Sequence, residues 1–218
     1  MDKQRQTQFS LVWAKSDYND PQKIHLLLFH LLESAAVTLI LWQESLSKSI
    51  KEDIANQLNL SITDTGKMLA YWVGLHDIGK ASPVFQSALE QKNSDLIMNI
   101  RNAGLPIRKD TGSAYHSHIS GKFIRENAIA PKEIDIAISG HHGLWNSYYV
   151  GISIYSYGNQ AWDVLRKTYC EVLKNVLSVH SMLTLEMEAE KKNSFVTWFS
   201  GLICVADWVA SDETKFQY

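Results

Sequence analysis

The segment Gly74-Leu-His-Asp-Ile-Gly-Lys80 follows an apolar helical pattern and contains a histidine directly followed by an aspartate. Glycine is a natural stop for a helix, so we expect the helix to end near Ile78-Gly79. The last turn of a helix is free of strict helical period, which lets His76 and Asp77 point into one cavity. Imidazole and carboxylate together suit a borderline divalent metal, and one carboxylate can bridge two metals. The alternative, which an isolated His-Asp pair favours, is a buried histidine bonded to its neighbour.

Helical spacing continues on both sides of this segment. Asp20-Pro21 is typical of a helix start, and apolar residues recur at spacings of three and four from Leu27 to Trp42. This pattern predicts one long helix to about Leu46. Polar residues interrupt the apolar stretch, so we interpret it as a buried helix and not as a membrane span. Further helices are expected over residues 50–58, from Ser61 or Thr63 to about 79, and over 84–89, 95–103, 114–127, 131–139, 162–179 and 195–210, with a long aromatic loop from Gly143 to Gly158.

The composition is that of a soluble globular protein. The chain has 218 residues, of which 45% are hydrophobic, and a formal net charge of -2. The length suits one domain, or at most two small ones, and with the helical spacing we expect one all-α domain over residues 1–218. The charge excludes a domain that is basic throughout, but it leaves open a local basic track or metal ions that supply positive charge. Cys170 and Cys204 are isolated, which favours buried thiols over a disulfide. The polar N-terminus shows no signal peptide, so we expect a cytoplasmic protein without a membrane partner.

Histidines at two further helices are candidate metal ligands. His30 lies in the most apolar helix, where a polar ring needs a partner, and Glu33 one turn later could orient it. A satisfied core histidine is the alternative. His116 and His118 are two residues apart and cannot face the same way on a regular helix. At most one of them is expected to be a ligand unless the helix starts between them.

Two more candidate positions come later in the chain. His141 and His142 lie between glycines at an expected helix end, where they could be either ligands or an exposed loop pair. Asp207 lies in a strongly apolar helix, and a carboxylate almost never lies buried without a partner or a metal. Together with the His-Asp pair, these positions would let a helical bundle build a two-metal site of the kind that hydrolyses phosphate esters.

The order of these residues resembles that of the HD phosphohydrolase superfamily. The longer motifs are similar to one branch of it, the N-terminal HD nuclease domain of the helicase-nuclease of type I CRISPR systems, most of all the type I-E form. The similarity runs from about Trp13 to the C-terminus. The motifs that carry it are Trp13-Ala-Lys-Ser16, His30-Leu-Leu-Glu-Ser-Ala-Ala-Val37, Gly74-Leu-His-Asp-Ile-Gly-Lys80, Gly140-His-His-Gly143 and Ala206-Asp-Trp-Val-Ala-Ser-Asp-Glu213.

The resemblance implies an all-α HD-domain bundle with a buried dinuclear metal site. It implies that one ion is held by His30, His76, Asp77 and Asp207, and the other by Asp77 as a bridge with His116, His141 and His142. His116 is preferred over His118 because its spacing to Ser120 is nearer to the family pattern. Asp77 and Lys80 would be catalytic, with Lys80 contacting substrate phosphate. Weaker substrate-binding candidates are Ser211 and Trp145, the second by stacking a base or gating the entrance; a loop packed over the core is its alternative.

The activity implied is metal-dependent hydrolysis of phosphodiester bonds in single-stranded DNA during type I CRISPR interference. A guide-RNA surveillance complex and a helicase would be the partners. The sequence contains no GxxxxGK[ST] motif, so we expect no helicase domain in this chain; the helicase would be a separate subunit or part of a longer protein. Manganese, iron, nickel, cobalt or zinc would suit the nitrogen-rich ligands better than calcium, and magnesium stays open although it prefers oxygen ligands and its own waters.

Two alternative functions stay open. The first is another HD enzyme that hydrolyses nucleotides or cyclic nucleotides. The second is a helical module without enzymatic activity, whose metal is only structural and which recruits a guide complex. A fully coordinated metal with no open position would favour the second alternative.

Overall fold

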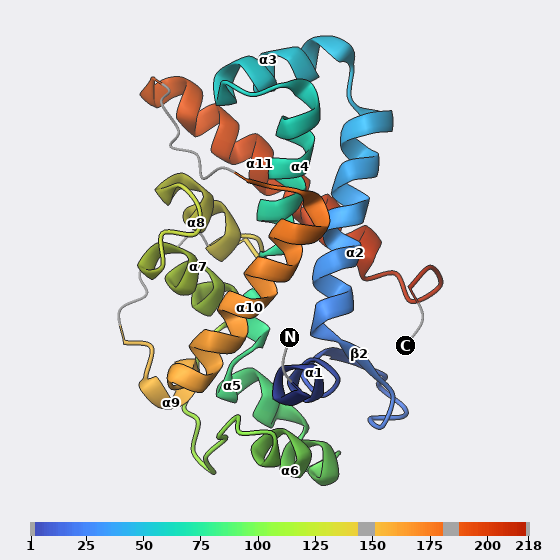
Figure 1. Ribbon diagram of the computed structural model, residues 1–218, viewed down its shortest axis with the longest axis vertical. Coiled ribbons are helices and arrows are strands. Elements are labelled where there is room, and N and C mark those ends of the chain that lie inside the picture. The colour runs from blue at the N-terminus through green and yellow to red at the C-terminus, as the bar shows by residue number, and fades with distance from the viewer. Residues whose placement is uncertain (1–2, 144–150, 181–187, 217–218) are drawn as a thin grey trace.

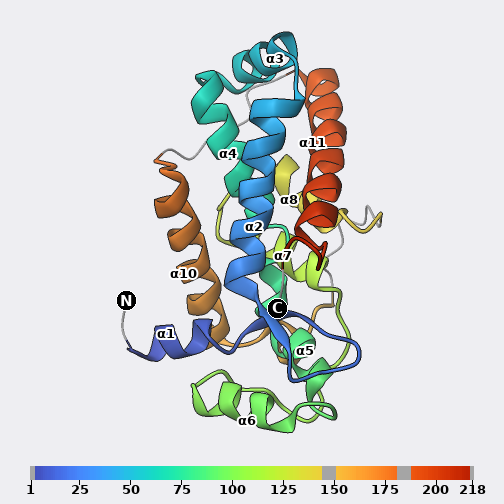
Figure 2. The ribbon, with the colours of Figure 1, turned by 90° about the vertical axis from the view of Figure 1, so that its right-hand side faces the viewer.

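The computed structural model describes residues 3–143, 151–180 and 188–216. A single helix, α2 (Leu27–Ile40), packs between α4 (Ile62–Gly74) and α11 (Ala189–Ala210), as Figure 2 shows. The rings of Trp72 on α4 and Phe199 on α11 meet edge to face, 5.9 Å apart. These three helices form the apolar centre on which the rest of the bundle packs.

The remaining helices surround this centre. Helix α3 lies at one end of the molecule, and α5 and α6 lie at the other (Figure 1). Helices α7 and α8 pack against each other, and α8 also packs on α11. Their bounds are α1 (Lys3–Phe9), α3 (Lys48–Leu58), α5 (Pro83–Gln86), α6 (Ser94–Asn102), α7 (His116–Glu126), α8 (Lys132–Ser139), α9 (Ile154–Tyr157) and α10 (Gln160–Leu177), with 3-10 turns η2 (Ile78–Lys80) and η3 (Ser87–Leu89).

Most predicted helices are confirmed, with ends that shift by a few residues. Ser61, one of two predicted caps, begins α4: its hydroxyl accepts a hydrogen bond from the Asp64 amide at 3.0 Å. Helix α11 begins at Ala189, earlier than the predicted residue 195. The predicted loop from Gly143 contains the short helix α9, and its residues 144–150 lie outside the described residues.

The predicted helix start at Asp20-Pro21 is wrong. The chain instead forms an antiparallel hairpin of β1 (Trp13–Ser16) and β2 (Ile24–Leu26), and α2 begins only at Leu27. The Asp20 carboxylate accepts from the Gln22 amide at 3.2 Å, and its carbonyl accepts from the Lys23 amide at 2.9 Å. Asp20 therefore caps the hairpin turn, because short acidic side chains favour turns as well as helix starts.

At its far end, α2 continues into a π-helical turn, η1 (Leu41–Ser45). The Trp42 indole donates to the Ile62 carbonyl at 3.0 Å and covers Gly66 so closely that a Cβ there would lie 2.4 Å from the ring. By length and composition alone, residues 27–45 are apolar enough to cross a membrane. In the fold, however, α2 is the core helix that contacts both α4 and α11.

Candidate metal centre

Asp77 lies at the centre of a cluster of imidazole rings. The predicted end of the preceding helix was a few residues too late: α4 stops at Gly74, and the Leu75 and His76 amides bond back to the Trp72 and Val73 carbonyls. This tight turn and the following η2 bring the side chains of His76 and Asp77 into the interior, where Asp77 is only 2% exposed.

One oxygen of Asp77 belongs to a first group of candidate ligands, which consists of His30, His76, Asp77 and Asp207. Asp77 Oδ2 lies 2.9 Å from His30 Nε2 and 3.4 Å from His76 Nε2. Asp207 Oδ1 lies 3.4 Å from the same two nitrogens. The four side chains come from α2, the turn after α4 and α11, and together they could hold one metal ion.

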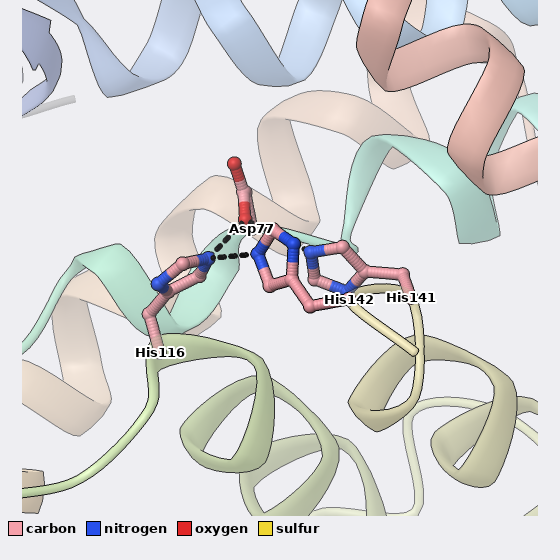
Figure 3. Close-up of side chains that lie close together, drawn as sticks. All are labelled: Asp77, His116, His141 and His142. Carbon is pink, nitrogen blue, oxygen red and sulfur yellow. Dashed lines mark hydrogen bonds and ion pairs between the residues drawn. The ribbon is translucent and has the colours of Figure 1, made fainter. Parts of the chain in front are cut away.

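The other oxygen of Asp77 faces a second group, formed by Asp77, His116, His141 and His142 (Figure 3). Asp77 Oδ1 lies 3.1 Å from His116 Nε2 and 3.6 Å from His141 Nε2. His142 Nε2 and His116 Nε2 lie 3.0 Å apart. Because both oxygens of one carboxylate are directed at different nitrogen sets, Asp77 is placed as a bridge would be.

The hydrogen bonds of the rings fit a cation between them. His76 Nδ1 and His141 Nδ1 lie 2.8 and 2.5 Å from the Val73 and Ile138 carbonyls, so the protons are held on the outer nitrogens. Their Nε2 atoms and Asp77 Oδ1 are buried and make no hydrogen bond to any residue that the structure describes. Buried polar atoms normally have partners, and a carbonyl on the outer nitrogen is the usual companion of a metal-ligating histidine.

The electrostatics leave most of these groups ready to bind a cation. Although burial opposes it, Lys80 and His76 hold the pKa of Asp77 well below its ordinary value, and the His30 and His76 rings beside Asp207 likewise lower the pKa of that carboxyl. Burial lowers the pKa of His141 to about 3. Burial also lowers the pKa of His76, but the Asp77 and Asp207 carboxylates outweigh it and raise the value to about 10. Ligands must be deprotonated, so a cation would displace a proton from His76.

Comparison with known proteins identifies the family to which the chain belongs. The family model described as Cas3, HD domain, matches residues 13–216. The chain belongs to the Cas3 HD-domain family. This confirms the predicted family and the predicted HD-domain helical fold, while the subtype stays a prediction.

Two curated Cas3 proteins are similar along nearly the whole chain. The CRISPR-associated nuclease/helicase Cas3 of Streptococcus thermophilus is 26% identical over 231 residues, covering 94% of this chain and 25% of that protein. The CRISPR-associated endonuclease/helicase Cas3 of Thermus thermophilus is 27% identical over 217 residues, with coverage of 95% and 22%. The chain therefore spans about a quarter of the length of these Cas3 relatives.

Solved structures show the same fold. A crystal structure of a CRISPR-associated protein has a TM-score of 0.88 and 30% identity, covering 99% of this chain and 24% of that one. The Thermus thermophilus cas3 HD domain in the presence of Ni2+ has a TM-score of 0.67 and 23% identity, with coverage of 97% and 80%. The second likeness supports the Cas3 HD fold alone.

In this Cas3 HD chain, the packing of one glycine explains why His116 reaches the cluster. Gly79 in η2 donates its amide proton to Ser120 Oγ at 2.8 Å, and Ser120 Oγ donates to the His116 carbonyl at 3.1 Å. Helix α7 begins at His116, so this ring points at Asp77, whereas the ring of His118 lies against Tyr115. The structure thus brings His116 into the cluster and leaves His118 out of it.

The weaker site predictions have different outcomes. Glu33 does not orient His30: its carboxylate lies 2.6 Å from His25 Nε2. Lys80 is buried, with its Nζ 2.6 Å from Asp77 Oδ2. Ser211 lies beside Asp207, to which its hydroxyl donates at 3.0 Å. Trp145 lies outside the described residues.

Sequence reasoning missed Gln86, which is hydrogen-bonded to the turn that carries Asp77 and Lys80. Its amide nitrogen donates to the carbonyls of Trp13 and Lys80 at 2.8 and 2.9 Å, and its oxygen accepts from the Trp13 amide at 3.3 Å. Gln86 is fully buried. Its neighbours in sequence carry no motif, so only the three-dimensional structure reveals this link.

Proposed function

We propose that this chain is a metal-dependent nuclease domain that hydrolyses phosphodiester bonds of single-stranded DNA during type I CRISPR interference. The observation that carries the proposal is the Asp77 carboxylate, whose two oxygens face two different sets of imidazole nitrogens. Membership of the Cas3 HD-domain family supports it, since the Cas3 relatives are named as a nuclease/helicase and an endonuclease/helicase.

The proposed centre holds two divalent transition metal ions. One would be bound by His30, His76, Asp77 and Asp207, and the other by Asp77, His116, His141 and His142. When bound, such ions lower the pKa of water and stabilise charge on a phosphate undergoing displacement. Five imidazoles favour manganese, iron, cobalt, nickel or zinc, while magnesium prefers oxygen ligands. A Cas3 HD structure described in the presence of Ni2+ is consistent with this preference.

The protein's own groups would prepare the site for a phosphate. Asp77 is held as an anion by its neighbours, and it keeps His30 and His76 facing inward. Lys80 lies on the Asp77 carboxylate with its Nζ 5.5 Å from the centre of the Phe85 ring. We assign to its ammonium the contact with a substrate phosphate oxygen, where a fixed positive charge opposes charge that develops in the transition state.

The partners proposed are single-stranded DNA, a guide-RNA surveillance complex and a helicase, either in the same protein or as a separate subunit. The names of the Cas3 relatives support the helicase. The surveillance complex is supported by a solved structure described as a CRISPR RNA-guided surveillance complex, pre-nicking, which matches this fold with a TM-score of 0.74 and 23% identity. We also propose that residues 1–218 act as a single nuclease domain in the cytoplasm.

The test incubates the purified chain with circular single-stranded DNA and adds manganese, nickel, cobalt, iron, zinc or magnesium in turn. We expect cleavage with the transition metals, loss of cleavage in chelator, and loss in Asp77→Asn, which keeps the shape of the side chain. Asp95→Asn is the matched control, because Asp95 is an exposed residue at the start of α6. Cleavage that survives chelator or Asp77→Asn would overturn the proposal.

The same preparation separates the alternative functions. Turnover of mononucleotides or cyclic nucleotides without cleavage of circular DNA would favour a nucleotide phosphohydrolase. Tight metal binding without turnover of either substrate would favour a structural module.

A further inference from the structure

The side chain of Lys15, on the β-hairpin near the start of the chain, reaches the C-terminal end of α11. Lys15 on β1 donates from Nζ to Ser211 Oγ at 2.5 Å and lies 3.4 Å from the Ala210 carbonyl. Ala210 is the last residue of α11, and Ser211 caps it. The ammonium thus has two acceptors within the protein, and Lys15 is half-buried where an ordinary surface lysine would be exposed.

Ser211 connects Lys15 to the first group of candidate ligands by hydrogen bonds. Its hydroxyl accepts from Lys15 and donates to Asp207 Oδ1 at 3.0 Å. That same oxygen lies 3.4 Å from both His30 Nε2 and His76 Nε2. Since a hydroxyl has one proton to donate, the lysine fixes its direction by occupying the acceptor side.

We propose that Lys15 is a positioning residue that acts through Ser211 to aim the Asp207 carboxylate at the first metal site. The inference rests on the proposed function only in so far as that site binds a metal. Asp207 is the one member of its group that lies on α11, and no backbone turn fixes its carboxylate as the turn after α4 fixes His76 and Asp77. A carboxylate on a helix turns about its own bonds, so an outer partner must choose the orientation.

The hairpin is also linked to the turn that carries Asp77, so its position relative to the candidate centre is fixed. Gln86 joins Trp13 on β1 to Lys80 on the turn that carries Asp77. A register shift between Trp13 and Lys15 marks a bulge in β1, and bulges re-aim the side chains of a strand. Trp13 packs on Phe85 while Lys15 reaches α11. The hairpin is therefore linked both to the turn that carries Asp77 and to the end of the helix that carries Asp207.

This assignment changes the role of Ser211. The sequence suggested a substrate-binding hydroxyl, but its proton and its acceptor side are both used within the protein. We assign it to the link between Lys15 and Asp207.

The test titrates the metal-free chain with Mn2+ by calorimetry and follows the bound ion by electron paramagnetic resonance, without DNA. Lys15→Met and Ser211→Ala are each expected to weaken one of two Mn2+ sites by about 10- to 100-fold, the usual effect of removing an outer partner of a ligand. The double variant should be no weaker than either single variant, and Lys15→Arg should restore most of the affinity. In an Asp207→Ala background, Lys15→Met should change nothing further.

Lys23→Met is the matched control, because Lys23 is an exposed lysine of the same hairpin. Thermal melts accompany every variant. A lower melting temperature for Lys15→Met with both Mn2+ affinities unchanged would show a purely structural role and overturn the inference. If the losses of Mn2+ affinity in the two single variants add up in the double variant, the inference would also be overturned.

The outcomes also separate this inference from the proposed function. A wild-type chain that binds no Mn2+ refutes the proposed metal centre itself. A chain that binds Mn2+ and shows the Lys15 effect, but never cleaves DNA, refutes the nuclease and leaves the positioning role intact.

Discussion

Gly79 lies where the turn that carries Asp77 meets the start of α7. A Cβ at this position would lie 2.0 Å from the His116 carbonyl oxygen and 2.6 Å from the Ser120 amide nitrogen. These are backbone atoms, so they cannot swing aside. We expect Gly79→Ala to push α7 away, to cost about 1–3 kcal/mol of unfolding free energy as overpacking does, and to weaken metal binding by the group that contains His116.

Urea unfolding and Mn2+ titration of the Gly79 variant measure both effects. Gly201→Ala is the control, because Gly201 is an exposed residue inside α11, and apart from its own helix backbone no atom of the described residues lies within 4 Å of an added Cβ. That change should stabilise the chain by about 0.5–1 kcal/mol, since alanine favours helices over glycine. Equal stability of the Gly79 variant and the wild type would contradict the packing described here.

The two histidines of α7 give a second prediction. His116 lies 3.1 Å from Asp77, while His118 packs its ring against Tyr115, 5.5 Å between centroids. We expect His116→Ala to reduce the bound Mn2+ from two ions per chain to one, and His118→Ala to keep two. Metal analysis after gel filtration measures the number of Mn2+ ions per chain. Loss of an ion in the His118 variant would contradict the choice of His116 as the ligand.

At the scale of elements, Gln86 is a cross-link between β1 and η2. It satisfies the Trp13 amide and the carbonyls of Trp13 and Lys80, on residues that are themselves buried. Gln86→Leu keeps the volume but removes its hydrogen bonds to the buried Trp13 amide and carbonyl, and each buried group left without a partner costs about 1–3 kcal/mol. The Lys80 carbonyl still accepts from the Ser82 amide at 2.8 Å. The urea midpoint should therefore fall by more than for Gln91→Leu, an exposed control in the same region. Similar midpoints for the two variants would show that the cross-link contributes little.

The start of α2 shows what a local signal cannot decide. Asp20-Pro21 has the chemistry of a helix start and also that of a turn. The choice depends on pairing of β1 with β2, through contacts such as Lys15 with His25 across the hairpin. Such pairing between separated segments has no signature in helical period. By contrast, α4 and α10 could be predicted because their apolar residues repeat at helical spacing along one continuous segment.

At the scale of the whole molecule, the candidate centre joins helices from both ends of the sequence. Its side chains come from α2, the turn after α4, α7, the turn after α8 and α11. A metal that binds only the folded chain should stabilise it, by about 2.7 kcal/mol at a free concentration one hundred times the dissociation constant. We expect the melting temperature to rise with Mn2+ concentration and to fall on adding chelator. Asp77→Asn should abolish the rise; a rise that persists would place the stabilising ion elsewhere.

Buried acidic groups predict how stability depends on alkaline pH. Burial raises the pKa of Cys170 to about 12 and also raises the pKa of Tyr71 and Tyr169. In the unfolded chain these groups lose their protons at lower pH than in the folded chain. The unfolded state then binds fewer protons, so the free energy of unfolding falls as pH rises above about 9.

Urea unfolding at pH 8 to 11 measures this decline. Tyr169→Phe removes one of the three groups and, because its hydroxyl makes no hydrogen bond to any residue in the described ranges, leaves no new orphan. Its decline should be shallower than that of the wild type. Parallel declines would mean that Tyr169 ionises as readily in the fold as in the unfolded chain.

The members of the two candidate groups could be identified from sequence because each stands out against its surroundings. His30 and Asp207 are polar within apolar helices, and His141 and His142 lie at a helix end. Their partners could not be predicted in the same way. Glu33 stands one turn after His30, yet it pairs with His25, because the hairpin brings that ring to the same face.

The order of these residues along the chain also sets an order of events during protein synthesis. Domains are made from the N-terminus at about 5–20 residues per second. The group around His116, His141 and His142 is complete in the emerging chain well before α11 has been made. The group around His30 and His76 waits for Asp207, and for α11 to dock against α2. A chain still on the ribosome would thus carry half a centre, and only the finished fold could hold both ions.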